Sequence, residues 1–157
     1  PGTMNYENGP NGRDQGLELE LNYDFGRGTY LALNYAYYRP ISPHTAFRNW
    51  PAPRHIGNVM ANIRFSRHLN FYAQCHVEDG FRRDVGDPRD DPSGYATVDA
   101  TLIAKKFLKG YEGLELRGSV YNLFDKDYTS PFGDPTTMPT DIPRAGRSFI
   151  IELKYKF

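Results

Sequence analysis

Alternation of apolar and polar residues with a period of two is the feature of this sequence that most limits its fold. Segment 16–25 shows it clearly, because its odd positions from Leu17 to Phe25 are apolar and its even positions from Glu18 to Asp24 are polar. This pattern predicts a strand with one apolar and one wet face. Similar segments follow at 29–38, 55–65, 71–78, 95–107, 114–124 and 146–157, and none has a helical period. The sequence therefore predicts an all-β fold of about seven strands.

The connections between these segments alternate in length. Those at 39–53, 79–94 and 125–145 are long and rich in Pro, Gly and Asp, whereas those at 26–28, 66–70 and 108–113 are short. Outer-membrane barrels sort their loops in this way, with long loops outside the cell and short turns in the periplasm. The alternation therefore predicts an antiparallel up-and-down transmembrane β-barrel.

Composition argues against several other classes of protein. The 19 basic residues balance the 19 acidic ones, so the chain has no net positive charge that would attract a nucleic acid. No apolar run approaches the roughly 20 residues of a spanning helix. The mean hydropathy of -0.66 is compatible with a barrel, whose strands are half polar. Cys75 is the single cysteine and the four His residues lack ligand spacing, so we expect no disulfide, metal site, cofactor or catalytic group.

Aromatic residues favour a membrane over water as the surroundings of the apolar face. The chain contains 12 Tyr and 10 Phe. Several lie near strand ends on the apolar face: Tyr23, Phe25, Tyr35, Tyr37, Phe65 and Phe71. Transmembrane barrels place aromatic girdles at both interfaces and polar side chains inside, so we expect outer-membrane lipid as a partner. Two alternatives stay open: a small closed outer-membrane barrel of about eight strands, an adhesin or structural protein in which 4–8 supplies a strand, and a soluble all-β ligand-binding module.

The C-terminal segment 146–157, GRSFIIELKYKF, has an apolar face that ends on an aromatic residue. That face consists of Phe149, Ile151, Leu153, Tyr155 and Phe157. A terminal Phe after alternating apolar residues resembles the β-signal by which outer-membrane proteins are recognised for insertion. We therefore predict that these residues form a membrane-insertion signal, with the barrel assembly machinery as partner.

Several segments match the end of TonB-dependent outer-membrane receptors in the right order. They are GLELELNYDF (16–25), PRHIGNVMANIRF (53–65), YATVDATL (95–102), VYNLFDKDY (120–128) and IPRAGRSFIIELKYKF (142–157). The resemblance extends from about residue 8 onward. Its most specific part is NLFDKDY followed by PR and a terminal aromatic strand.

The resemblance implies that the chain is part of a larger barrel. Receptors of this family have about 22 strands around a plugged lumen, which seven strands cannot enclose. We expect 16–157 to be the C-terminal strands of such a receptor, whose plug and TonB box lie elsewhere. Residues 1–15 are then an N-terminal segment in an extracellular loop, and the first four, PGTM, are compatible with a remnant of cloning.

The same resemblance implies a transport function in the bacterial outer membrane. The parent receptor would bind a scarce nutrient, a ferric siderophore or similar metal chelate, and TonB would act only through the plug of that parent. Aromatic residues beside arginines suit an anionic, partly apolar ligand. The candidates for substrate binding are Phe47, Arg48, Trp50, Phe81, Arg82 and Arg83. The acidic stretch 84–94 lacks the spacing and glycine of a calcium loop, so we expect it to be solvated.

Overall fold

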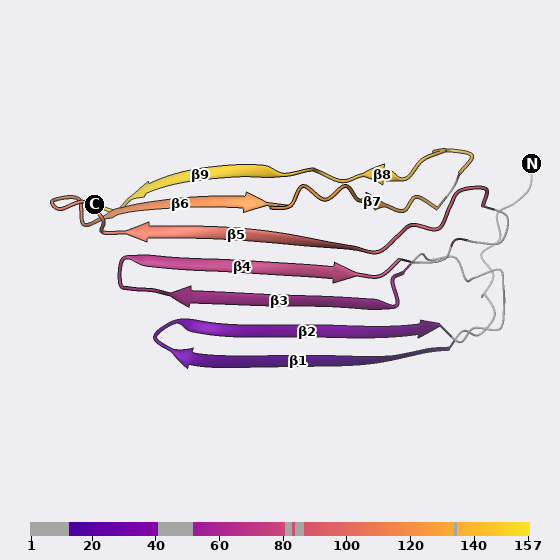
Figure 1. The fold of residues 1–157 in the computed structure, drawn as a ribbon, viewed down its shortest axis with the longest axis horizontal. Coiled ribbons are helices and arrows are strands. Elements are labelled where there is room, and N and C mark those ends of the chain that lie inside the picture. Colours follow the sequence, from indigo (N-terminus) through magenta and orange to yellow (C-terminus); the bar gives the residue numbers. More distant parts are fainter. Residues whose placement is uncertain (1–12, 41–51, 81–82, 84–86, 134) are drawn as a thin grey trace, which may run out of the picture.

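The computed structural model describes residues 13–40, 52–80, 83, 87–133 and 135–157, and in this part of the chain it contains strands and no helix (Figure 1). The strands are β1 (Asp14–Gly26), β2 (Thr29–Pro40), β3 (His55–Arg64), β4 (Leu69–Glu78), β5 (Tyr95–Lys105), β6 (Leu114–Tyr121), β7 (Thr129–Ser130), β8 (Ile142–Pro143) and β9 (Ser148–Tyr155). Seven of them form one antiparallel sheet in the order β1-β2-β3-β4-β5-β6-β9, and β7 pairs with β8. No described helix is long and apolar enough to cross a membrane.

The two ends of the sheet differ in their connections, as the sequence predicts. Figure 1 shows the short turns and the C-terminus at one end, and at the other end the strand ends between which the long connections run. The hairpin between β1 and β2 is the tightest, with φ values of 83° at Gly26, 55° at Arg27 and 81° at Gly28. Glycine adopts such left-handed conformations without steric cost. We refer below to the short-turn end and the long-loop end of the sheet.

Cross-strand register places apolar residues of all seven strands on one face. Residues that pair directly across antiparallel strands lie on the same face of a sheet. One such row contains Leu21, Leu33, Val59, Cys75 and Val98, and the next contains Tyr23, Leu31, Ala61, Ala73, Ala100, Val120 and Phe149. The opposite face carries rows such as Glu20, Asn34, Asn58, His76 and Thr97. The predicted division into an apolar and a polar face is confirmed.

The described residues contain no buried apolar side chain. The two buried residues among them, Ser119 and Asn122, are polar, whereas Leu17 is 63% exposed and Ile151 is 80% exposed. A soluble β-sandwich packs the inner faces of two sheets into an apolar core. The open apolar face therefore argues against a soluble ligand-binding module.

The predicted strands agree with the seven strands of the sheet to within a few residues at each end. The largest difference is at β6, which ends at Tyr121 rather than at 124 because Asn122 has a φ of 49° and leaves the extended conformation. The short strands β7 and β8 within the last long connection were not predicted. Within the described part of the chain, β1 and β9 each have a strand neighbour on one side, so the sheet is not closed into a barrel.

Candidate functional site

Side chains on the polar face bond to one another across the strands. The amide of Asn58 donates to Asn34 Oδ1 at 2.7 Å, and Asn58 Oδ1 lies 2.8 Å from His76 Nδ1. Because an amide oxygen can only accept, Nδ1 of His76 carries the proton in this contact. The other ring nitrogen, Nε2, is 3.5 Å from Glu78 Oε2. The polar groups thus form a ladder across β2, β3 and β4.

The polar face continues across β5, β6 and β9 with hydroxyl and charged pairs. Thr101 and Ser119 are joined at 3.0 Å between their hydroxyl oxygens. Closer to the short-turn end, Lys105 Nζ lies 3.1 Å from Glu115 Oε2, and Arg117 Nε lies 3.6 Å from Glu152 Oε2. No buried side-chain polar atom of the described residues lacks a hydrogen-bond partner. This face can therefore border water or polar groups along its whole width.

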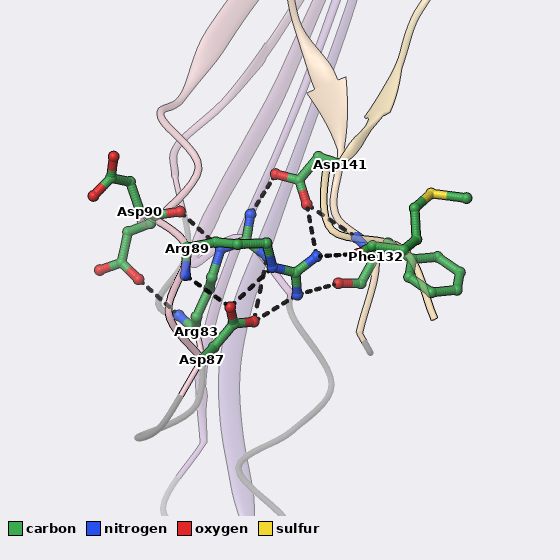
Figure 2. Close-up of polar contacts among 8 residues, drawn as sticks. Arg83, Asp87, Arg89, Asp90, Phe132 and Asp141 are labelled. Atoms are coloured by element: carbon green, nitrogen blue, oxygen red, sulfur yellow. Dashed lines mark hydrogen bonds and ion pairs between the residues drawn. The ribbon is translucent and has the colours of Figure 1, made fainter. Parts of the chain in front are cut away.

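At the long-loop end, an ion-pair cluster joins two connections that are distant in sequence (Figure 2). Arg83, Asp87 and Arg89 come from the connection between β4 and β5, and Asp141 immediately precedes β8. Arg89 Nη2 donates to Asp87 Oδ2 at 2.5 Å and to the carbonyl oxygen of Phe132 at 2.7 Å. Arg83 Nη2 donates to Asp141 Oδ2, and Arg89 Nη1 is 3.7 Å from Asp141 Oδ1. We call these four charged residues the loop clamp.

The loop clamp alternates its charges, so each carboxylate lies between two guanidinium groups. Asp87 contacts Arg89 and also Arg83, whose Nη1 is 3.7 Å from Asp87 Oδ2. The four side chains are only 7% to 11% exposed. The hydrogen bond from Arg89 lowers the pKa of Asp87 to about 2, and the charges of Arg89 and Arg83 add to this effect. The clamp ties the two connections together at neutral pH.

The structure brings one of the predicted substrate-binding residues, Arg83, into the loop clamp. Besides its contacts with Asp87 and Asp141, Arg83 donates from Nε to the carbonyl oxygen of Asp90 at 2.7 Å. All three guanidinium nitrogens therefore face protein oxygens, and contact with a ligand would require the clamp to open. The other predicted substrate-binding residues, Phe47, Arg48, Trp50, Phe81 and Arg82, lie outside the described residues.

The acidic stretch around the clamp differs in part from the expectation of a solvated loop. Asp90 and Asp91 are exposed as expected. The expectation is wrong for Asp87, whose side chain is enclosed by the two arginines. No group of three or more His, Cys, Asp or Glu side chains in the described ranges could hold a metal ion. The alternation of Arg83, Asp87 and Arg89 was visible in the sequence, but nothing local linked it to Asp141.

The NLFD segment after β6 has a structural role. Asn122 is 4% exposed, and its backbone N–H donates to Asp99 Oδ1 at 2.8 Å. Its side chain both donates to the carbonyl oxygen and accepts from the N–H of Lys126, each at 2.9 Å. Asp125 Oδ1 accepts from the N–H of Arg147 at 2.7 Å, just before β9. The segment thus ends β6 and fixes the approach to β9.

The residues predicted to form the insertion signal lie on or beside the last strand. Phe149, Ile151, Leu153 and Tyr155 share the exposed apolar face of β9, and Phe157 follows the end of the strand. The rings of Tyr155 and Phe157 meet edge to face, with centroids 5.0 Å apart. The common apolar face of Phe149, Ile151, Leu153 and Tyr155 is confirmed. The role of these residues and of Phe157 in insertion stays a prediction.

Solved receptor structures share this fold. The ferric-catecholate import receptor Fiu from E. coli K12, closed form, has a TM-score of 0.75 at 18% identity over 93% of this chain and 21% of its own. The siderophore receptor PiuA from Acinetobacter baumannii has a TM-score of 0.71 at 17% identity, over 93% of this chain and 22% of its own. The ferric yersiniabactin uptake receptor FyuA from Yersinia pestis has a TM-score of 0.69 at 22% identity, over 92% of this chain and 23% of its own. The chain spans about a fifth to a quarter of the length of these receptors.

Sequence comparison assigns the family. No individually curated protein sequence matches the chain. The family model described as "TonB dependent receptor-like, beta-barrel" matches residues 1–123, which is well over half of the 157 residues. The sheet topology and the exposed apolar face agree with this match. This chain belongs to the family of TonB-dependent receptor β-barrels.

Proposed function

We propose that the chain forms the C-terminal wall of an outer-membrane receptor that imports a scarce nutrient in a TonB-dependent manner. The observation that carries the proposal is the two-faced sheet of a receptor-family chain, with an exposed apolar face and a hydrogen-bonded polar face. In membrane barrels the apolar face contacts lipid and the polar face lines the lumen. The long connections are then extracellular and the short turns periplasmic.

The last strand supports a further part of this proposal, the route of insertion. β9 is an edge of the described sheet, and its apolar residues Phe149, Ile151 and Leu153 are exposed. A free edge offers unpaired backbone donors and acceptors to another strand. We propose that the barrel assembly machinery binds this edge during insertion, and that in the complete receptor another strand of the barrel pairs with it.

The proposed substrate is a ferric siderophore or similar metal chelate. Similar solved structures are described as receptors for ferric catecholates and for ferric yersiniabactin, and another as a copper transporter. At 22% identity or less these structures support the class of cargo and do not fix the compound. The family consists of receptors and transporters, so the proposed role is transport and not catalysis.

The test uses the complete receptor in cells that lack other iron-chelate receptors. Radioactive iron is supplied as catecholate, hydroxamate or phenolate chelates, and both surface binding and uptake are measured. We expect at least one chelate to be taken up, and we expect uptake but not binding to stop when TonB is deleted. Failure to bind any of the chelates, or uptake that continues without TonB, would contradict the proposal.

A further inference from the structure

A cavity of about 280 Å³ opens on the polar face at the short-turn end. Its lining includes Arg64, Arg67, His68, Lys105 and the amides of Asn62 and Asn70. These residues belong to β3, β4, β5 and the turn between β3 and β4. No Asp or Glu lines the cavity. The cavity therefore gathers positive charge without an internal counter-charge.

Hydrogen bonds fix one arginine at the rim of this cavity. His68 Nδ1 lies 3.1 Å from the carbonyl oxygen of Lys105, which can only accept, so Nδ1 carries the proton. The other ring nitrogen, Nε2, then accepts from Arg67 Nε at 2.8 Å. The turn itself is held by Ser66, whose Oγ accepts from the N–H groups of His68 and Leu69. Arg67 is thus oriented through its Nε, and its two terminal nitrogens have no acceptor in the described part of the chain.

The positive charge at this end is only partly compensated. Lys105 is paired with Glu115, but neither Arg64 nor Arg67 has an ion-pair partner among the described residues. The short connections also carry Arg27, Lys106 and Lys109 against a single acidic residue, Glu112. The middle of the polar face differs, because the polar side chains of Asn34, Asn58 and His76 are hydrogen-bonded to one another there. Concave surfaces lined by one sign of charge concentrate the field that attracts a counter-ion.

We propose that this cavity binds an anionic oxygen group, a phosphate or a carboxylate, with Arg64 and Arg67 as the main donors. Guanidinium groups bind both oxyanions through paired N–H donors. The cavity is smaller than typical small-molecule sites of about 300–1,000 Å³, so it suits a single anionic group and not a whole chelate. The group belongs either to a free anion or to an acidic side chain elsewhere in the complete receptor. The proposal of this site requires that the polar face is turned away from lipid, and it does not require that the receptor imports a nutrient.

The test titrates inorganic phosphate into the detergent-solubilised complete receptor by calorimetry, at constant ionic strength set with chloride. The double variant Arg64→Gln/Arg67→Gln removes both donors. Arg27→Gln is the matched control, because Arg27 lies in a short turn but does not line the cavity. For a free anion we expect phosphate to bind the wild type and the control, with affinity reduced roughly tenfold or more in the double variant.

A second measurement, the Tm, tests the case in which an acidic side chain of the receptor itself occupies the cavity. Phosphate then fails to bind the wild type, and at low salt the double variant has a lower Tm than Arg27→Gln. Phosphate affinity that is unchanged in the double variant would overturn the proposal. Absence of phosphate binding would also overturn it if the Tm of the double variant equals that of the control. None of these readouts involves iron uptake, so the import proposal can fail separately.

Discussion

Asn122 gives the clearest prediction at the scale of single residues. It combines a φ of 49° with hydrogen bonds to both backbone groups of Lys126. Asn122→Ala leaves these groups unpaired and places a less tolerant residue in the left-handed region. We expect it to lower the free energy of unfolding by about 2–4 kcal/mol, measured by urea unfolding of the detergent-folded complete receptor. Asn122→Gly keeps the backbone conformation, so its free energy of unfolding should fall by less. An alanine variant as stable as the wild type would contradict the prediction.

The loop clamp should depend on pH through Asp87. Its pKa is lowered to about 2 from an unperturbed value of 3.8, chiefly by the hydrogen bond from Arg89. A lowered pKa means that the clamp is fully stabilised above the unperturbed value and loses this contribution as pH falls through 2. We expect pepsin to cleave the stretches 87–94 and 129–142 much faster at pH 2 than at pH 4, relative to an unstructured substrate.

The control for this experiment is Asp87→Asn, which removes the titrating group but keeps the shape of the side chain. It should make cleavage of both stretches fast at either pH. A wild-type receptor whose cleavage changes no more with pH than the unstructured substrate would show that the ion pairs do not hold the two connections.

Single residues were also the scale at which sequence reasoning was weakest. Arg83 was predicted to bind substrate because it follows an aromatic residue and another arginine in a long connection. Its partner Asp141 is 58 positions away, and only the folding of two connections over the same end of the sheet brings them together. The short strands β7 and β8 are two residues each and include Pro143, so they carry no alternation that could be recognised.

At the scale of strands, the sequence was more informative because one face of each strand in the seven-stranded sheet is apolar. A period of two is visible along a strand without any knowledge of its neighbours. The ends of strands depend on local backbone conformation instead, as at Asn122, where φ is positive. The faces were therefore predicted residue by residue. Some strand ends were also predicted correctly, such as the start of β3 at His55, whereas others were wrong by a few positions.

The apolar face can be tested strand by strand with arginine substitutions. Leu33 lies beside Leu21 and Val59, and Leu153 is an exposed residue of β9. Arg at Leu33, or separately at Leu153, should cost about 2–4 kcal/mol near the middle of the membrane, because the charge is placed in hydrocarbon. The measurement is unfolding of the complete receptor in lipid vesicles. Arg at Asn34 or Glu152, on the polar face, is the matched control, and larger losses there would reverse the assignment of the faces.

At the scale of the whole molecule, the orientation across the membrane follows from the two ends of the sheet. Cysteines at Asn49, Gly86 and Gly133 probe the long connections, and cysteines at Arg27 and Lys109 probe the short ones. Each is introduced singly into the complete receptor with Cys75→Ala to remove the native thiol. We expect an impermeant thiol reagent to label the first set on intact cells, and the second only after the outer membrane is permeabilised. The opposite pattern would invert the proposed topology.

The open edges of the sheet lead to a prediction for the isolated 157-residue chain. β1 and β9 are separated by five other strands, and neither pairs with the other. Unpaired backbone groups in hydrocarbon cost several kcal/mol each, and bacterial barrels close with an even number of strands. We therefore expect the isolated chain to associate through β1 or β9, so that its mass in detergent exceeds that of one copy. A smaller closed barrel would instead need an additional strand from residues outside the described ranges.

Hydrogen exchange of the amides in β1 and β9 distinguishes association of the isolated chain from closure into a small barrel. In an associated chain, amides of β2 to β6 should be protected by the pairs within the sheet, and protection at β1 or β9 should fall on dilution because it comes from a second copy. In a closed small barrel, both edge strands would be protected independently of concentration. A stable monomer with protected amides in both Asp14–Gly26 and Ser148–Tyr155 would contradict the prediction. It would favour the small outer-membrane barrel over the wall of a larger receptor, because only closure can satisfy both edges within one copy.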